Sequence, residues 1–230
     1  MRWTIFNGSP RAKKSNSDVL VSKLREGLVV AGGQVEGPHY LVQARKRDEH
    51  LAAFAAAERV LVVFPLYVDA MPAQVVEFFA ALADRVGRDD NPPMAFLVHS
   101  GFPEACHSRG VERYLEKLCK RLGSEYLGTM VKGGSEGIQV MPGWMTRKVF
   151  RTMAALGGDL GRDGAPSAAN LRALAGEERL GAFKRVLLRL MKAVGLSDQY
   201  WKQQLRKNGV WERRYARPYE PTASAPPAGS

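Results

Sequence analysis

The stretch "RVLVVFP" at residues 59–65 is apolar at every position after its first. An uninterrupted apolar run of this length is expected for a strand that is buried on both faces of a parallel sheet. The stretch "AQVVEFFAALADRVG" at 73–87 follows Pro72 directly, and proline is favoured in the first turn of a helix. The two stretches therefore predict a buried strand that leads into a covering helix.

The same alternation continues in both directions along the chain. Further strands are expected at 2–6, 35–42, 94–101 and 125–134, the second of them interrupted by Gly37 and Pro38. Helices are expected at 18–33, 47–58, 111–123, 144–156 and 179–194. Strands that alternate with helices indicate a parallel sheet with helices on both faces. The expected fold class is therefore α/β, with an open doubly wound five-stranded sheet that is either Rossmann-like or flavodoxin-like.

Composition limits the compartment and the class of protein. The chain has 230 residues, of which 45% are apolar, as in globular proteins with a substantial core. Its two cysteines, Cys106 and Cys119, form no CxxC pair, so we expect a reducing environment and a cytoplasmic protein. The N-terminal apolar run is too short for a signal peptide, and no run reaches the roughly 18 apolar residues of a membrane-spanning helix.

Positive charge is concentrated near the C-terminus. The formal net charge is +11, and residues 179–217 hold eleven Lys and Arg against only Asp198 and Glu212. We therefore divide the chain into a domain at 1–178, a basic helical extension at 179–217 and a flexible tail at 218–230. We expect the extension to pack on the body or on a partner subunit. The alternatives are binding to nucleic acid or to an anionic membrane surface, and packing is favoured over both.

The loop "NGSPRAKKSNSD" at 7–18 follows the first expected strand and leads into a helix that is expected to begin near Ser17 or Asp18. Unpaired backbone N–H groups at a helix N-terminus favour an anion, and a phosphate in particular. Neither a G-x-G-x-x-G nor a G-x-x-x-x-G-K-[ST] pattern is present, so the loop suits one terminal phosphate better than a pyrophosphate. A capped turn without a ligand would use the same residue types. The candidate phosphate contacts are Ser9, Arg11, Ser15, Asn16 and Ser17.

Three more loops follow expected strands and should meet at the same sheet edge. They begin "FPLYVDAMPAQV" at 64, "HSGFPEACHS" at 99 and "GGSEG" at 133. The last matches the G-x-S-x-G pattern of hydrolases, but no helix start follows it and no histidine occurs after His107, so we reject that reading. The histidines and cysteines show no metal-ligand spacing, so no metal is expected.

Together, "NGSPRAKKSNS", "FPLYVDAMPAQVVEFF", "HSGFPE" and "KGGSEGIQ" resemble the flavodoxin-like NAD(P)H-dependent FMN reductases over roughly residues 2–140. The resemblance implies a sheet in the order 2-1-3-4-5, with FMN at the ends of the strands. It also implies that the five contacts of the first loop hold the FMN phosphate. The segments that it places along the flavin ring are Pro65, Leu66, Tyr67 and Val68 on one side, and His99, Ser100, Gly101, Phe102, Gly133 and Gly134 on the other.

The function implied is an oxidoreductase that passes hydride from NADH or NADPH through FMN to a small-molecule acceptor such as a quinone or a flavin. The cofactor carries that chemistry, so no side chain is expected to be catalytic. A homo-oligomer such as a dimer is expected. The alternatives are a flavin-binding electron carrier without NAD(P)H turnover, and a nucleic-acid or anionic-surface binding module that uses the basic extension.

Overall fold

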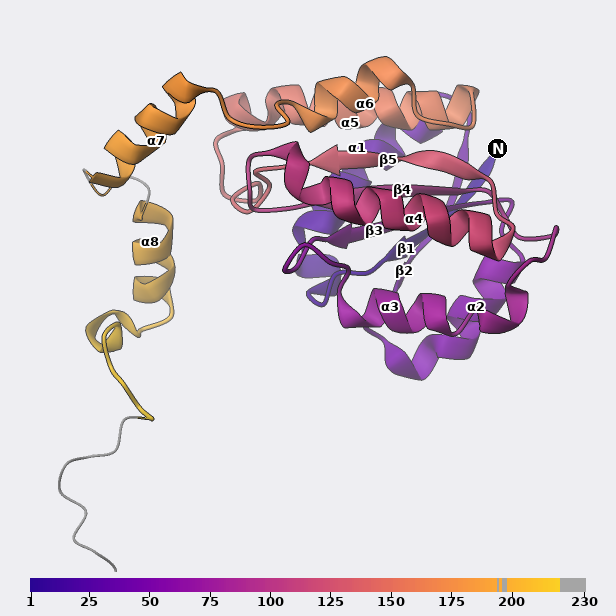
Figure 1. Ribbon diagram of the computed structural model, residues 1–230, viewed down its shortest axis with the longest axis horizontal. Coiled ribbons are helices and arrows are strands. Elements are labelled where there is room, and N and C mark those ends of the chain that lie inside the picture. The colour runs from indigo at the N-terminus through magenta and orange to yellow at the C-terminus, as the bar shows by residue number, and fades with distance from the viewer. Residues whose placement is uncertain (194, 196–197, 220–230) are drawn as a thin grey trace, which may run out of the picture. The chain divides into compact units, whose positions relative to one another are not determined.

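The sheet is the centre of the molecule. The computed structural model describes residues 1–193, 195 and 198–219. Its strands are β1 (Arg2–Asn7), β2 (Gln34–Tyr40), β3 (Arg59–Pro65), β4 (Met94–His99) and β5 (Tyr126–Lys132). They form one sheet in the order β2-β1-β3-β4-β5, and all neighbouring pairs are parallel (Figure 1). The predicted α/β class and strand order are confirmed.

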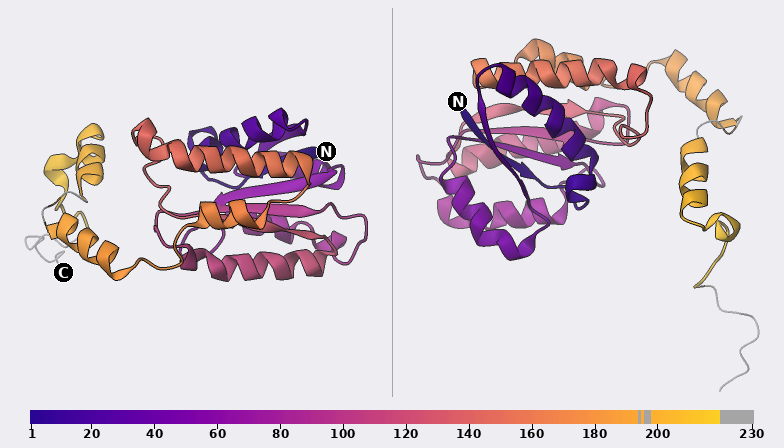
Figure 2. Two further views of the ribbon diagram at one scale, coloured as in Figure 1. Left: turned by 90° about the horizontal axis from the view of Figure 1, so that it is seen from above. Right: turned by 180° about the vertical axis from the view of Figure 1, so that it is seen from behind.

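Helices cover both faces of the sheet (Figures 1 and 2). Those of the body are α1 (Asn16–Val30), α2 (Arg47–Ala55), α3 (Ala73–Ala80), α4 (Arg109–Leu122), α5 (Gly143–Arg162) and α6 (Ala168–Ala175). Helices α1, α5 and α6 pack on one face, and α2, α3 and α4 pack on the other. Each face has its own hydrophobic cluster, because side chains alternate between the two sides of a strand.

Strand β3 shows why an apolar run predicts a doubly covered sheet. Val62 and Phe64 belong to the cluster on the α2–α4 side, whereas Leu61 and Val63 belong to the cluster under α1 and α5. All four side chains are fully buried. By contrast β2 lies at the edge of the sheet, where Gly37 and Pro38 are tolerated because an edge strand needs fewer ladder hydrogen bonds.

Helix α5 is longer than the sequence predicts. The helix expected at 144–156 continues through Gly157 and Gly161 to Arg162. These glycines face α1 at very close range. A Cβ on Gly157 would lie 1.9 Å from the carbonyl oxygen of Leu24, and one on Gly161 would lie 2.8 Å from the Cβ of Ala31. The glycines therefore allow close packing of two helices instead of ending one.

Two further differences concern helices. Helix α3 ends at Ala80 and is followed by a short 3₁₀ turn at Ala83–Arg85, whereas the pattern suggests one helix to residue 87. Helix α6 was not expected. It begins with Ser167 as its cap, whose side chain accepts a hydrogen bond from the N–H of Asn170, and its Leu174 reaches the core.

The chain divides into two units, Met1–Leu180 and Gly181–Ser230. Within the described part of the second unit, α7 (Ala182–Ala193) corresponds to the helix expected at 179–194, and α8 (Gln199–Lys207) follows it. The guanidinium groups of Arg206 and Arg214 lie 4.8 Å and 4.1 Å from the ring centre of Trp211. The basic and aromatic residues of this unit are therefore partly occupied with one another.

The flexible tail expected at 218–230 lies mostly outside the described residues, which end at 219. The packing of the basic extension on the body or on a partner stays a prediction. No helix in the described part of the chain combines the length and the apolar content needed to cross a membrane.

Candidate functional site

A pocket of about 120 Å³ lies at the carboxyl edge of the sheet, where the loops after β1, β3, β4 and β5 meet. It is lined by Ser9, Arg11, Asn16, Pro65, Leu66, Tyr67, His99, Ser100, Gly101, Ser135 and Glu136. All but Ser135 and Glu136 are candidates named from the sequence. The fold thus brings four distant segments together at one place.

The first loop is fixed to its surroundings through Gly8. Its N–H donates to the carbonyl of Val63 on β3 at 2.7 Å, and its carbonyl accepts from the side-chain amide of Gln74 on α3, also at 2.7 Å. A Cβ on Gly8 would lie 2.1 Å from Cγ2 of the buried Val75. A side chain at this position would push the loop off its support, so glycine is required here for close packing.

Among the side chains of this loop that line the pocket, Ser9 and Arg11 remain available to a ligand. The N–H of Ser9 donates to Oδ1 of Asn7 at 2.9 Å, and the N–H of Arg11 donates to Oγ of Ser9 at 3.3 Å. The Ser9 hydroxyl acts only as an acceptor in these contacts, so its proton is free to be donated. The guanidinium of Arg11 makes no hydrogen bond or ion pair within the described residues.

Helix α1 begins at Asn16, earlier than the Ser17 or Asp18 expected from the sequence. The reason is its cap, because Oγ of Ser15 accepts a hydrogen bond from the N–H of Asp18 at 3.1 Å. The backbone N–H groups of Asn16 and Ser17 lie in the first turn, where no carbonyl of the helix can accept from them. They also stand at the positive end of the helix dipole, which favours an anion.

The side chain of Asn16 connects two loops. Its Nδ2 donates to the carbonyls of Ser135 at 2.9 Å and Glu136 at 3.1 Å, and its Oδ1 accepts from Nε2 of Gln139 at 2.8 Å. The amide therefore holds the loop after β5 against the first loop. Ser15 and Asn16 were expected to offer side-chain donors to a phosphate, but the amide of Asn16 is used by the protein itself. The Ser15 hydroxyl only accepts a hydrogen bond and keeps its proton, but Ser15 does not line the pocket.

A buried hydrogen-bonded chain runs through His99, which is only 4% exposed. Oγ of Ser17 lies 2.7 Å from its Nε2, and Oγ of Ser135 lies 2.9 Å from its Nδ1. Ser135 has one hydroxyl proton, which it donates to the carbonyl of Ser100 at 3.0 Å. Ser135 must therefore accept from Nδ1–H, and in a neutral imidazole Nε2 then accepts from the Ser17 hydroxyl.

The neutral state of the imidazole is what sets the direction of the hydrogen bond at Nε2. Burial, and then the nearby charge of Lys132, lower the pKa of His99 to about 3. The hydroxyl proton of Ser17 is committed to His99, so Ser17 can reach an anion only through its backbone N–H. Ser135 was not named as a site residue from the sequence, although its segment matches the G-x-S-x-G pattern. Its role here is to link β4 and β5 through His99.

The loop after β3 forms a tight turn beside the pocket. Tyr67 and Ala70 exchange two backbone hydrogen bonds of 2.9 Å, and Val68 and Asp69 at the tip have φ values of 49° and 57°. Two central residues in the left-handed region are the mark of a type I′ turn, which is unusual for a β-branched residue. Val68 is 98% exposed and does not line the pocket, whereas Tyr67 does.

Phe102, Gly133 and Gly134 lie outside the lining as well. The ring of Phe102 stacks on His107 with 4.5 Å between ring centres. A Cβ on Gly133 would lie 2.7 Å from the carbonyl oxygens of Phe102 and Pro103. Gly133 therefore allows two of the protein's own loops to approach each other, whereas the sequence suggested an approach to a ligand.

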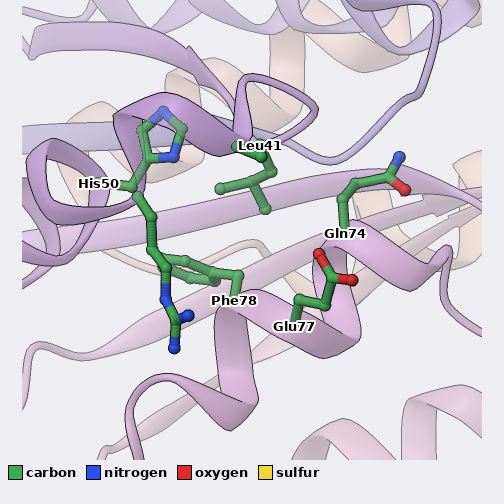
Figure 3. A pocket seen from close by; sticks show the side chains of 7 residues that line it. Leu41, His50, Gln74, Glu77 and Phe78 are labelled. Carbon is green, nitrogen blue, oxygen red and sulfur yellow. The ribbon is translucent and has the colours of Figure 1, made fainter.

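Larger cavities lie elsewhere in the described part of the body, and two of them adjoin α3. One of about 400 Å³ lies between the end of β2, α2 and α3, and Figure 3 shows His50 and Gln74 at opposite ends of it, with Leu41 and Phe78 between them. The other, of about 500 Å³, is a mainly apolar groove between α3 and α4. Judged by volume alone, these two cavities would be better candidates for a ligand site than the smaller pocket. The pocket at the carboxyl edge is the better candidate, because only there do four strand ends and a helix N-terminus converge.

Solved structures share the fold of this chain. An NAD(P)H:quinone oxidoreductase from Methanothermobacter marburgensis is 18% identical, with a TM-score of 0.55 over 70% of this chain and 96% of that one. An FMN-dependent NADH-azoreductase from Bacillus anthracis is 14% identical, with a TM-score of 0.54 over 70% and 100%. An NADH:FMN oxidoreductase is 15% identical, with a TM-score of 0.54 over 76% and 95%. The chain has the flavodoxin-like fold.

No protein-family model matches the sequence, and no curated protein sequence matches it. The likeness to the solved structures is therefore a likeness of fold. In a flavodoxin-like sheet the strand order reverses between β1 and β3, and ligands bind beyond the strand ends at that point. Ser9 and Arg11 follow β1, and Leu66 and Tyr67 follow β3, so the pocket occupies the place where a flavodoxin-like fold binds its ligand.

Proposed function

We propose that this chain is an FMN-dependent NAD(P)H oxidoreductase. One observation carries the proposal: at the switch point of a flavodoxin-like sheet, the first turn of α1 meets the free donors of Ser9 and Arg11. The structurally similar proteins named above, which act on NAD(P)H, quinone, FMN or azo compounds by their descriptions, support it. When bound, FMN would supply the hydride chemistry.

The residues present fit a single phosphate. The phosphate would be held by the backbone N–H groups of Asn16 and Ser17, the hydroxyl of Ser9 and the guanidinium of Arg11. None of these groups has a carboxylate partner within the described residues. Pockets that enclose a small molecule usually measure roughly 300–1,000 Å³, so the 120 Å³ pocket would enclose only part of FMN. Pro65, Leu66, Tyr67, Ser100 and Gly101 are the lining residues that would contact the ring. Val68, Phe102, Gly133 and Gly134 do not line the pocket, so we propose no ring contact for them.

The buried chain through His99 would keep the site in shape. Ser17 belongs to the first loop, His99 to the end of β4 and Ser135 to the loop after β5, so the three hydrogen bonds tie together three of the four walls. A neutral histidine leaves no extra buried charge near the cofactor. We assign no residue as a catalytic acid or base, and we propose that electrons leave to a small-molecule acceptor such as a quinone or a flavin.

Replacement of Arg11 by alanine should weaken FMN binding by roughly 10–100-fold, because a hydrogen bond to a charged group contributes about 1.5–3 kcal/mol. Riboflavin lacks the phosphate, so its affinity should stay the same. Both affinities can be measured by titration of flavin fluorescence. Lys13→Ala is the matched control, since Lys13 is a basic residue of the same loop that does not line the pocket. Equal losses for the two flavins would exclude a phosphate contact from Arg11.

Turnover needs a separate test. FMN-loaded protein should lose its flavin absorption on anaerobic addition of NADH or NADPH and regain it when a quinone is added. Flavin that binds but is not reduced by either nucleotide would favour the electron-carrier alternative. The expected homo-oligomer stays a prediction, which the molar mass in solution would check.

A further inference from the structure

The turn after β4 brings three metal-binding side chains together. Glu104 precedes the short 3₁₀ helix Ala105–Ser108, and Cys106 and His107 lie within that helix. One carboxylate oxygen, the Cys106 sulfur and one imidazole nitrogen all lie within 4.8 Å of one another. All three residues are half-buried, so a small ion can reach them while part of its surroundings is protein.

The spacing between His107 and Glu104 is informative. Nε2 of His107 lies 3.6 Å from Oε2 of Glu104. That is longer than an ordinary hydrogen bond of about 2.7–3.2 Å. A nitrogen and an oxygen ligand on one tetrahedral zinc ion, with bonds of roughly 2.0–2.2 Å, are separated by about 3.3–3.6 Å. Nε2 of His107 and Oε2 of Glu104 are thus spaced like two ligands of one ion. Only the sulfur of Cys106 would have to move closer.

Both ligands are also held from behind, as ligands in metal sites generally are. The other oxygen of Glu104, Oε1, accepts a hydrogen bond of 2.7 Å from the N–H of Leu180. The other nitrogen of His107, Nδ1, faces Oδ1 of Asp69 at 3.7 Å, and the ring is stacked on Phe102. Nε2 therefore faces Glu104 while Nδ1 faces a second carboxylate, so a carboxylate–histidine–metal arrangement would need Asp69 to move only a little closer to Nδ1.

We propose that Glu104, Cys106 and His107 bind a zinc ion, with Asp69 as the positioning residue for His107. Thiolate and imidazole are ligands that zinc favours, whereas calcium and magnesium prefer oxygen alone. Three protein ligands leave one tetrahedral position for water. No metal was expected from the sequence, because the histidines and cysteines show no metal-ligand spacing. The site does not depend on the proposed flavin chemistry.

A zinc titration of the full chain, freed of metal by chelation and dialysis, tests this. Competition with a chromophoric chelator should show one equivalent of Zn²⁺ bound by the wild type. Cys106→Ser and His107→Ala should each abolish that binding. Asp69→Asn replaces the carboxylate by an amide, and asparagine also suits the left-handed backbone at φ 57°. This variant should weaken zinc binding roughly 10–100-fold. Cys119→Ala is the control and should bind zinc normally, because Cys119 is fully buried in the core.

Co²⁺ in place of Zn²⁺ reports the geometry. Visible bands of tetrahedral intensity, at wavelengths longer than flavin absorption, should appear in the wild type and in Cys119→Ala and be missing in Cys106→Ser. Circular dichroism of each variant without metal would show that it is folded, and Asp69→Asn changes only an exposed side chain. A wild type that binds no zinc, or a Cys106→Ser variant with wild-type affinity, would overturn the proposal. The second result would indicate that Cys106 is not a ligand.

Discussion

Between pH 7 and pH 5 the wild type should lose about 2 kcal/mol of stability because of His99, and replacement of His99 by asparagine should abolish that loss. The folded protein holds His99 as a buried neutral ring with a pKa of about 3, whereas the unfolded chain has the ordinary value near 6.5. As the pH falls below 6.5, the unfolded chain takes up a proton that the folded protein does not. The stabilisation is therefore complete above pH 6.5 and is lost as the pH falls toward 3.

Urea unfolding at several pH values between 7 and 5 would measure this dependence. The informative quantity is the difference in slope between the wild type and His99→Asn, because the other titrating groups contribute to both proteins. Ser135→Ala is the matched control. It removes the hydrogen-bond partner of Nδ1 and should lower the stability at every pH, but it keeps the titrating ring and hence the slope. Parallel pH profiles for the wild type and His99→Asn would show that His99 is not the neutral group of this network.

Replacement of Gly157 by alanine should destabilise the protein by about 3 kcal/mol, the upper part of the usual range for overpacking a tight contact. The added Cβ would lie 1.9 Å from the carbonyl oxygen of Leu24, which is rigid backbone of α1. Gly27 on α1 has the reciprocal contact, with a Cβ position 1.8 Å from the carbonyl oxygen of Ala154. The two helices approach through both glycines, so neither helix can yield without moving away from the sheet.

The direction of this effect is the test. In an exposed helix, glycine to alanine stabilises by up to about 1 kcal/mol because glycine is the poorer helix former. Gly110 in α4 is the matched control, since nothing lies within 4 Å of its Cβ position, and Gly110→Ala should stabilise or be neutral. Thermal and urea unfolding would measure both variants. Equal stabilisation by the two substitutions would mean that α1 and α5 do not touch at Gly157.

The candidate site was predictable where its residues follow buried strands. The apolar run of β3 locates Pro65, Leu66 and Tyr67 at a strand end, and the polar loop after β1 stands out against the core. The partners of individual side chains were not predictable. Asn16 and Ser17 look like free donors in the sequence, but their side chains bond to Ser135 and His99, which are more than 80 residues away. Hydrogen bonds of that kind depend on which loops the sheet order makes neighbours.

Local patterns by themselves therefore determined the alternation of strand and helix, the doubly covered sheet and the loops that form the candidate site. The periods of apolar residues and the residue types at helix ends are properties of short segments, so they can be read without the fold. The tertiary structure alone decided that Gly157 continues a helix, that His99 is buried and neutral, and that Asp69 faces His107. Each of these depends on groups brought together from distant parts of the chain, and no local pattern contains that information.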